Sequence, residues 1–270
     1  MRSPIMQALT GIAKAWFILL LASWIGLPIA VAMIYAVSDR DAIYEPTPIP
    51  LEYSLRQLQE LWYLGAGSAI VNSVIVALLT IAISFALGVP AGYAFARYVF
   101  PGKDFLKLLI IGLRMFPIIV IAVPLATLYI RLGLSDSLLG LALAHSAMSI
   151  PFVVLITSGV FAGVSRELEE AGMVFGLDPL GVFLRITIPL ALPGLAAAAM
   201  FTFLMSWNEV FIASILTTTN RPLSAFILST ALTAPDYYKF AGTLIIILPA
   251  LVFVFITRRY LIAIWGITVR

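Results

Sequence analysis

The chain has 270 residues, of which 62% are hydrophobic and only 11% are charged. A soluble domain usually carries about 25% charged residues, so a water-soluble globule is excluded, and the apolar residues lie in blocks that indicate membrane spans. The sequence has no cysteine and one histidine, which excludes disulfides and multi-histidine metal sites, and its net charge of +3 comes from scattered basic residues, which do not indicate nucleic-acid binding.

Six apolar blocks follow one another, at roughly residues 15–38, 66–96, 106–130, 138–163, 188–215 and 240–264. Each is long enough to cross a hydrocarbon layer of about 30 Å at about 1.5 Å per residue. We therefore predict an all-α integral membrane protein with six transmembrane helices. We divide it into an N-terminal helix with an outer loop, residues 1–65, and a five-helix core, residues 66–270.

The first block follows Arg2 and Lys14, a pattern that signal peptides share. Its uncharged run, residues 16–37, is long enough to span a bilayer, so we expect a retained helix. The segment after it, about residues 39–63, is acidic and rich in proline. This composition suits simple solvation outside the membrane, and contact with a binding protein is the alternative.

The distribution of basic residues predicts the orientation. If both termini are cytoplasmic, the inner segments hold ten Lys and Arg residues and the outer segments hold five, with Arg114 left inside a span. Because segments rich in Lys and Arg stay in the cytoplasm, we predict that both termini and residues 165–188 lie there. The chain is then a multi-pass protein of the cell (inner or plasma) membrane.

Arg114 lies inside the third block, and His145 lies inside the fourth. A central Arg costs roughly 2.5–3.5 kcal/mol on insertion scales. We therefore expect Arg114 to face the bundle interior, as a structural or pathway residue, or to extend toward the cytoplasmic interface. His145 has no acidic neighbour in sequence, and we interpret it as a packed helix residue rather than a proton relay.

The segment between the fourth and fifth blocks is longer than the ~2–8 residues that a minimal connection needs. Ser165 is a good helix N-cap and Gly176 a good C-terminal cap. Asp178 followed by Pro179 predicts a second helix start. Apolar residues recur between the caps at helical spacing: Leu168, Ala171, Gly172 and Phe175. We predict a short amphipathic helix, a glycine break and a second helix.

The polar face of the short helix is acidic. Glu167, Glu169 and Glu170 fall in its first turns, where the helix dipole favours anions. A helix resting on lipid headgroups usually presents Lys and Arg, and an anionic leaflet would repel carboxylates. We therefore favour docking to a basic protein partner over contact with lipid.

Three polar or aromatic residues, Trp207, Asn208 and Glu209, lie near the end of the fifth block. Glu209 follows Pro189 by about 30 Å of helix, which places it near the outer interface, where it is an ordinary interfacial carboxylate in one interpretation. In the other, Trp207 and Asn208 line the outer part of a pathway. Their types suit a sugar, whose hydroxyls pair with amides and whose apolar faces pack on aromatic rings.

The segment at 165–189 resembles the EAA loop of ABC importer permeases, whose pattern is Glu-Ala-Ala, a downstream Gly and then Ile-x-Leu-Pro. Five positions match the pattern: Glu170, Ala171, Gly176, Ile186 and Pro189. Gly172, Phe175 and Ile188 stand where the family has Ala, Asp and Leu.

Other segments resemble the carbohydrate branch of this family, whose prototype is the smaller permease of maltose-type transporters. They are Asn72-Ser73, residues 91–97 with 100–103, Met115-Phe116-Pro117 and Trp207-Asn208-Glu209. The resemblance covers about residues 60–270 and implies a binding-protein-dependent transport inner-membrane component with the type I ABC importer fold.

The resemblance also implies partners: a homologous second permease, two cytoplasmic ABC ATPase subunits and an external solute-binding protein, importing a di- or oligosaccharide or a related solute. The helix around 166–176 would be the coupling helix in a cleft of one ATPase. The implied coupling residues are Glu167, Glu169, Glu170, Ala171, Gly176, Asp178 and Pro189. The implied pathway residues are Arg114, Met115, Phe116, Trp207, Asn208 and Glu209.

The sequence contains no phosphate-binding loop of the form Gly-x-x-x-x-Gly-Lys-Ser/Thr. Its only Gly-Lys pair is Gly102-Lys103, with Arg97 where the first Gly should stand and Asp104 after the Lys. We therefore expect a non-catalytic subunit that binds no cofactor, with ATP and Mg²⁺ held by the partner ATPase. Membrane lipid is an expected partner, and nucleic acid is not.

Three other functions remain open. A secondary transporter driven by protons or sodium often has broken helices and ionisable residues near the midplane, but Arg114 and Glu209 form no obvious relay in the sequence. A permease of the same class for polyamines or glycerol phosphate is the second, and residues 207–209 favour sugar only by resemblance. A membrane scaffold is the third, and it would not need the segment at 165–189.

Overall fold

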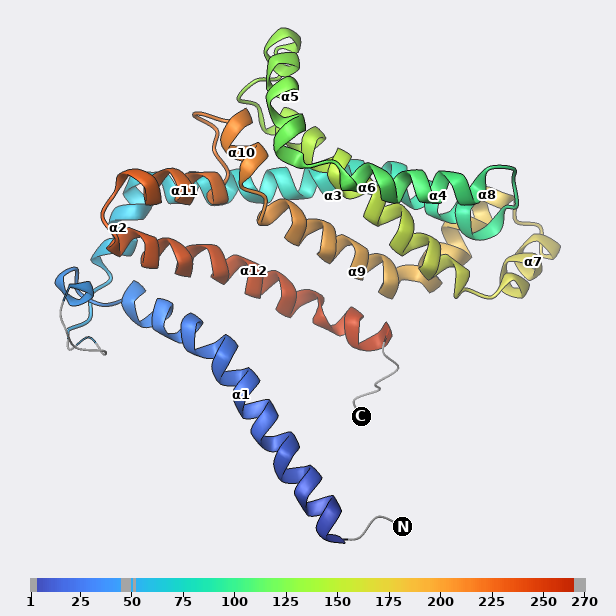
Figure 1. Ribbon diagram of the computed structural model, residues 1–270. Coiled ribbons are helices and arrows are strands. Elements are labelled where there is room, and N and C mark those ends of the chain that lie inside the picture. Colours follow the sequence, from blue (N-terminus) through green and yellow to red (C-terminus); the bar gives the residue numbers. More distant parts are fainter. Residues whose placement is uncertain (1–3, 45–49, 51, 265–270) are drawn as a thin grey trace. The chain divides into compact units, whose positions relative to one another are not determined.

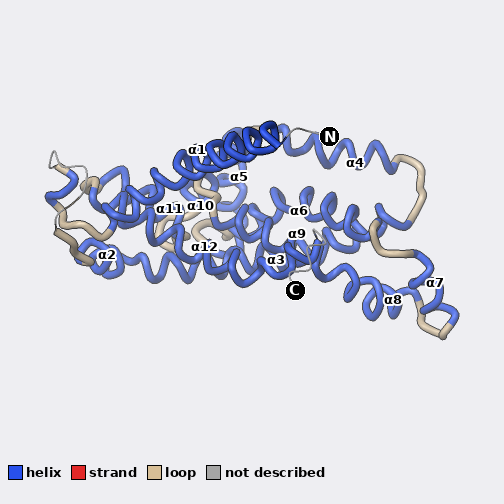
Figure 2. Tube along the Cα trace, turned by 90° about the horizontal axis from the view of Figure 1, so that it is seen from below, coloured by secondary structure: helices blue, strands red, loops and turns tan. Residues whose placement is uncertain are grey.

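The computed structural model describes residues 4–44, 50 and 52–264, and within them all regular structure is helical apart from one isolated bridge between Ser38 and Tyr53 (Figures 1 and 2). Glu45, Pro46 and Pro48 of the acidic loop, Arg2 and the C-terminal residues 265–270 lie outside the described residues. The prediction of an all-α protein is confirmed.

The chain divides into two compact units: residues 1–65 with 230–247, and residues 66–229 with 248–270. The first unit contains α1 (Pro4–Ala36), η1 (Asp41–Ile43), α2 (Arg56–Leu61) and the start of α12 (Tyr237–Ile264). Glu60 connects these elements: it pairs with Arg40, accepts a hydrogen bond from Arg56 at 3.2 Å, and accepts one from the Tyr238 hydroxyl at 2.8 Å. These contacts tie Arg40 and Arg56, which lie on either side of residues 45–49 and 51, to α2 and α12.

The second unit holds most of the remaining helices. After the π-turn η2 (Trp62–Ala66) they are α3 (Gly67–Arg97), α4 (Lys103–Gly112), η3 (Leu113–Met115), α5 (Ile118–Leu132), α6 (Leu138–Ala162), α7 (Arg166–Val174), α8 (Pro179–Val182), η4 (Phe183–Thr187), α9 (Ile188–Trp207), α10 (Phe211–Leu216) and α11 (Leu223–Thr233). The last residues of α11 belong to the first unit.

Five described helices are long and apolar enough to cross a membrane: Ala13–Ala36, Arg56–Arg97, Leu138–Ala162, Pro179–Trp207 and Tyr237–Phe255. The pair Lys103–Met115 and Ile118–Leu132 makes a sixth span if its two halves, which meet at 86°, are counted together. Each of the five helices therefore overlaps one predicted block, and the third block overlaps the bent pair.

The prediction of one continuous helix at 106–130 is wrong, because the helix is interrupted at Phe116 and Pro117. Pro117 has no N–H to donate and disfavours the helical conformation of the residue before it. Phe116 is accordingly extended, with φ −71° and ψ 124°. The helix expected at 188–215 also stops early, at Trp207, and a separate helix begins at Phe211.

Helices α3, α6 and α9 pack against one another through glycines that allow close approach. A Cβ built on Gly92 of α3 would lie 2.0 Å from Thr157 Oγ1 of α6, and one on Gly88 would lie 2.7 Å from Val153 Cγ1. On α9, a Cβ at Gly194 would lie 2.4 Å from Val160 Cγ2 of α6. These three helices form a tightly packed body, and α7 projects from one end of it (Figure 1).

Candidate functional site

The segment at 165–189 has the predicted caps. The Ser165 side chain accepts the Glu167 N–H at the start of α7, and the Asp178 side chain accepts the Gly181 N–H at the start of α8, with Pro179 at the first helical position. Gly176 has φ +92°. The Leu177 N–H bonds to the Gly172 carbonyl and the Gly176 N–H to the Met173 carbonyl, which is the Schellman ending. The helix, glycine break and second helix are confirmed.

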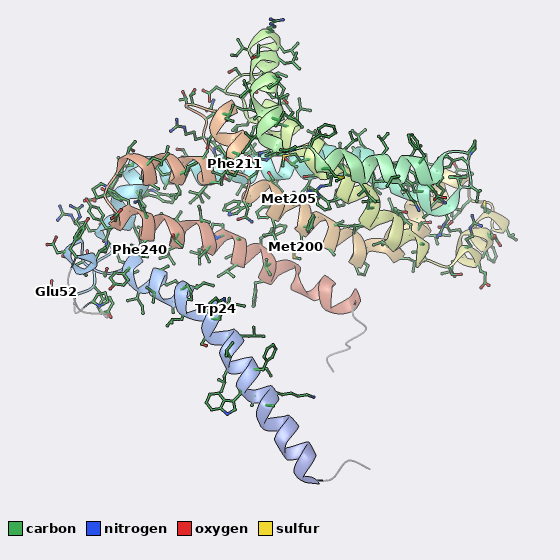
Figure 3. All side chains as sticks on the ribbon, viewed as in Figure 1. Trp24, Glu52, Met200, Met205, Phe211 and Phe240 are labelled. Atoms are coloured by element: carbon green, nitrogen blue, oxygen red, sulfur yellow. The ribbon has the colours of Figure 1, made fainter. Side chains whose placement is uncertain are left out.

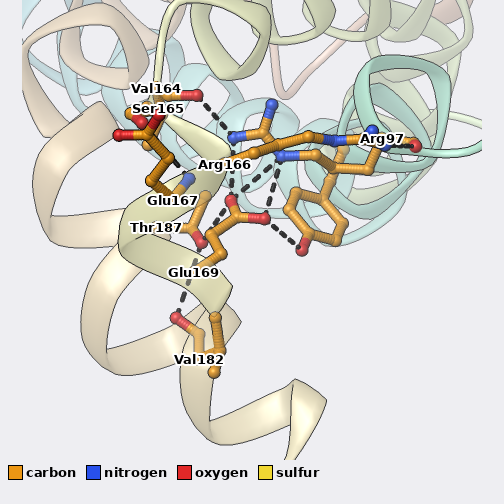
Figure 4. A network of polar contacts seen from close by, with 9 residues as sticks. Arg97, Val164, Ser165, Arg166, Glu167, Glu169, Val182 and Thr187 are labelled. Atoms are coloured by element: carbon orange, nitrogen blue, oxygen red, sulfur yellow. Dashed lines mark hydrogen bonds and ion pairs between the residues drawn. The ribbon is translucent and has the colours of Figure 1, made fainter. Parts of the chain in front are cut away.

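A buried charge pair holds the inner face of α7 to the end of α3 (Figure 4). Arg97 Nε lies 2.9 Å from Glu169 Oε2, and Arg97 Nη2 lies 2.8 Å from Glu169 Oε1. Glu169 Oε1 also accepts the Thr187 hydroxyl at 2.8 Å, and Oε2 accepts the Tyr93 hydroxyl at 3.2 Å. Only 8% of Arg97 and 5% of Glu169 are exposed, so the carboxylate is almost fully enclosed by donors.

The prediction that Glu169 shares an outward acidic face with Glu167 and Glu170 is therefore wrong. Residues three apart lie on one helix face, and Glu169 shares the inner face with buried Gly172. A Cβ on Gly172 would lie 2.4 Å from Ile186 Cδ1, so α7 packs closely against this side chain. Glu167 and Glu170 are exposed.

The surroundings of Glu169 also set its protonation. Burial by itself would raise the pKa of the carboxyl, but the hydrogen bonds from Arg97 and Thr187 and the charge of Arg97 outweigh burial. The pKa of Glu169 is therefore held below its ordinary value, and the group is a carboxylate at neutral pH.

The outer face of α7 is uncovered within the described chain. Val174 and Phe175 are 85% and 89% exposed, and Leu168 and Met173 are about half exposed. In the expected apolar stripe, only Gly172 is buried, whereas Leu168, Ala171 and Phe175 face outward. Pro189, in the first turn of α9, is exposed as well. A large apolar surface flanked by carboxylates is typical of an interaction surface.

Two of the three pathway candidates in the third span line a cavity at the break between η3 and α5. Arg114 and Phe116 line this cavity of about 490 Å³, together with Tyr129, Met148 and mostly aliphatic side chains. The Arg114 guanidinium carbon lies 3.2 Å from the centre of the Phe152 ring of α6. Met115 is highly exposed and is not among the lining residues.

The three candidates at the end of α9 have three different surroundings. Trp207 is buried and stacks on Phe203, with ring centres 5.5 Å apart. Asn208 is exposed and lines a second cavity, of about 440 Å³, with Met205 and Phe211. The side chains of Met205 and Phe211 are labelled in Figure 3. Glu209 lines the same cavity as Asn208, whereas Trp207 is not among its lining residues.

Glu209 is buried, so the interpretation as an ordinary interfacial carboxylate is wrong. It accepts the N–H groups of Ile212 and Ala213 at 2.9 Å each and thereby caps α10. Its Oε2 lies 3.3 Å from His145 Nε2 of α6, and His145 Nδ1 lies 2.8 Å from the Ser206 hydroxyl of α9.

The sequence interpretation missed this cluster because His145 and Glu209 are far apart along the chain. A general rule could have pointed to this cluster: a carboxylate or an imidazole within apolar helices needs a polar partner. Glu209 and His145 could therefore have been expected to pair with each other. His145 is a packed residue as predicted, but it has an acidic neighbour in space.

Comparisons with known proteins agree with this architecture. Residues 88–262 match the family described as binding-protein-dependent transport system inner membrane component. The chain is 33% identical over 203 residues to the trehalose transport system permease protein SugB of Mycobacterium tuberculosis (strain CDC 1551 / Oshkosh), covering 73% of this chain and 74% of that protein. It is 26% identical over 256 residues to the inner membrane ABC transporter permease protein YcjP of Escherichia coli (strain K12), covering 91% and 86%.

The fold matches a chain from the crystal structure of a bacterial ABC transporter involved in the import of the acidic polysaccharide alginate. The TM-score is 0.76 at 19% identity, over 96% of this chain and 99% of that one. The fold is therefore that of a type I ABC importer transmembrane domain along nearly the whole chain.

Proposed function

Because the chain belongs to the family of binding-protein-dependent transport system inner membrane components, we propose that it forms half of the translocation pathway of an ABC importer for a sugar. The sugar is a di- or oligosaccharide or a related solute. A homologous permease supplies the other half, two ABC ATPases supply the energy, and an external binding protein delivers the solute.

The outer face of α7 carries this proposal. Its inner face is fixed by the Arg97–Glu169 pair and by the packing of Gly172, so the uncovered apolar residues belong to a stable surface. Leu168, Val174 and Phe175 suit an apolar cleft, and exposed Glu167 and Glu170 suit basic groups at its rim. A cleft of this chemistry on an ATPase subunit is the occupant that we propose, with both termini and α7 in the cytoplasm.

In this mechanism the chain performs no bond chemistry. Closure of the ATPases on ATP displaces α7, and the displacement changes how the two permeases pack around the pathway. Such a mechanism requires a rigid connection between α7 and the membrane-spanning helices, because a flexible connection would not transmit the displacement.

Substrate class rests on two observations. The cavity at Arg114 and Phe116 and the cavity at Asn208 both combine apolar or aromatic walls with a few hydrogen-bonding groups, the pattern of small-molecule sites. The relative SugB is named for trehalose, and the structural neighbour is described as importing alginate. A sugar is the solute class that these observations support together.

The first test is purification of the tagged chain from its native membrane. An ATPase, a second permease and a binding protein should co-purify with it. The complex, reconstituted in proteoliposomes, should take up labelled trehalose, maltose or an alginate oligosaccharide at the expense of ATP. Purification without any ATPase, or ATP hydrolysis that no saccharide stimulates, contradicts the proposal.

The second test reverses one charge on the outer face of α7. Exposed ion pairs are worth about 0–1 kcal/mol, but a charge left unpaired in a buried interface costs about 3–5 kcal/mol. Glu170→Lys should therefore weaken ATPase binding or uncouple hydrolysis from uptake. Asp104→Lys, the same reversal at an exposed site on α4, is the matched control. Parent-like binding, hydrolysis and uptake in Glu170→Lys would remove α7 from the coupling role.

A further inference from the structure

The backbone alone does not fix α7 to the rest of the second unit. On one side, residues 163–165 connect it to α6, beginning with Gly163. On the other side the chain turns at Gly176, which has φ +92°, and the turn is held by the two backbone hydrogen bonds of the Schellman ending. A short helix between two glycine-containing connections can swing unless side chains hold it.

The side chains that hold α7 converge on one carboxylate. Arg97 from the last turn of α3 binds Glu169 through Nε and Nη2, and Thr187 from η4, which leads into α9, donates to the same carboxylate. Arg97 Nη2 also donates to the Val164 carbonyl at 2.9 Å. Arg166 of α7 returns a hydrogen bond to the Arg97 carbonyl. Three elements, α3, α7 and η4, therefore meet at Glu169 (Figure 4).

We infer that Arg97 and Glu169 form a latch that passes the displacement of α7 to α3 and α9, and that both are positioning residues for transport. The inference rests on the proposed function and deepens it, because it names the joint at which a movement of the coupling helix enters the membrane-spanning helices. An ion pair with two parallel hydrogen bonds fixes orientation as well as distance, which a single contact would not do.

Helices α3, α6 and α9 pack closely enough to move together when α3 is displaced. Gly88 and Gly92 of α3 sit against Val153 and Thr157 of α6, and Gly194 of α9 sits against Val160 of the same helix. Contacts this close leave no room for α3, α6 and α9 to shift against one another. A displacement delivered at Arg97 therefore moves the three helices together rather than bending one of them.

The test uses the complex that purifies with the tagged chain. Glu169→Gln keeps the size of the side chain and removes its charge, Arg97→Gln removes the other charge, and the double variant removes both. Asp104→Asn, on α4 and exposed, is the matched control. The measured quantities are the amount of ATPase that co-purifies and the number of saccharide molecules taken up per ATP hydrolysed.

The ATPase should still co-purify with each variant, because the outer face of α7 is unchanged. Uptake per ATP should fall roughly fivefold or more in each single variant, the lower range of typical coupling factors. The double variant should be no worse than the worse single variant, because the two residues act as one unit. A purely structural role would instead leave the uptake per ATP unchanged in whatever amount of complex is purified. Arg97→Lys, which keeps the charge but not the paired hydrogen bonds, should recover part of the ratio.

An unchanged ratio in both single variants overturns the latch, and so does a double variant whose loss is the product of the single losses. If the parent complex contains no ATPase, the proposed function fails while the latch is still judged on the purified chain. Amide hydrogen exchange throughout α7 should then be faster in Glu169→Gln than in Asp104→Asn. Equal exchange in these two variants overturns the latch independently of any ATPase.

Discussion

Glu169 is a carboxylate whose ionised form is stabilised by the folded chain, and this makes a pH dependence predictable. Burial opposes ionisation, but the hydrogen bonds and charge of Arg97 and the hydroxyl of Thr187 lower the pKa below the ordinary value of 4.5. A lowered folded-state pKa contributes stability that is complete above the unfolded-state pKa and is lost as the pH falls through the folded-state pKa. The stabilisation is therefore complete at pH 7, begins to decline near pH 4.5 and is lost as the pH falls through the lower folded-state pKa.

The corresponding measurement compares the parent chain with Glu169→Gln in detergent. At neutral pH the variant should be less stable by roughly 3 kcal/mol, because Arg97 is left buried without its counter-charge. The difference in thermal unfolding should stay constant from pH 7 to about pH 5 and shrink at lower pH. A difference that grows on acidification would show that the carboxylate is not the stabilising form.

Arg114 is the residue on which the pathway interpretation depends most. Its guanidinium lies over the Phe152 ring and beside the cavity of about 490 Å³. Replacing it with Leu removes an insertion cost of roughly 2.5–3.5 kcal/mol, so Arg114→Leu should insert at least as well as the parent. Saccharide uptake by the purified complex should nevertheless fall, and Arg114→Lys should retain more of it. Uptake equal to that of the parent in Arg114→Leu means that the residue is merely tolerated in the membrane.

At the scale of elements, the contact between α3 and α6 is set by the absence of a side chain. A Cβ on Gly92 would lie 2.0 Å from Thr157 Oγ1 and 3.0 Å from the Ser158 backbone nitrogen. Gly92→Ala should destabilise the chain by about 1–3 kcal/mol through overpacking. Gly159→Ala on α6 adds a Cβ that would meet no atom of a neighbouring element within 4 Å. This substitution should be neutral or mildly stabilising, because Ala favours the helix over Gly. Thermal unfolding of both variants in detergent separates these outcomes, and equal effects would contradict the close approach of the helices.

Elements whose ends depend on local residues could be predicted from the sequence. Ser165, Gly176 and Asp178 act within a few residues of themselves, and the structure has all three caps. The break in the third span was also locally encoded, since Phe116 precedes Pro117, but the apolar run concealed it. Glu169 could not be placed, because its partner Arg97 is 72 residues away. Nothing in the periodicity of α7 distinguishes Glu169 from Glu170 until that partner is known.

At the scale of the whole molecule, the Arg97–Glu169 pair constrains how many times the chain crosses the membrane between these two residues. Arg97 ends α3 and Glu169 lies in α7, so these two places are on the same side of the membrane. Helix α6 crosses once between them. The bent pair α4 and α5 must therefore cross as well, because an odd number of crossings would put the two charges on opposite sides. A re-entrant loop at the 86° bend would separate the two charges, so the ion pair favours six spans over five.

Single cysteines test this count and the orientation together, because the parent sequence has none. Val99, Val174, Tyr53 and Leu132 are exposed and suit labelling. In sealed vesicles, cysteines at Val99 and Val174 should react from one face and those at Tyr53 and Leu132 from the other. The excess of Lys and Arg predicts that the labelled face of Val99 and Val174 is the cytoplasmic one. Labelling of Leu132 from the same face as Val99 would make the bent pair re-entrant and leave five spans. It would also put Arg97 and Glu169 on opposite sides of the membrane. The same result would therefore contradict both the latch and the proposal that α7 docks to the ATPase.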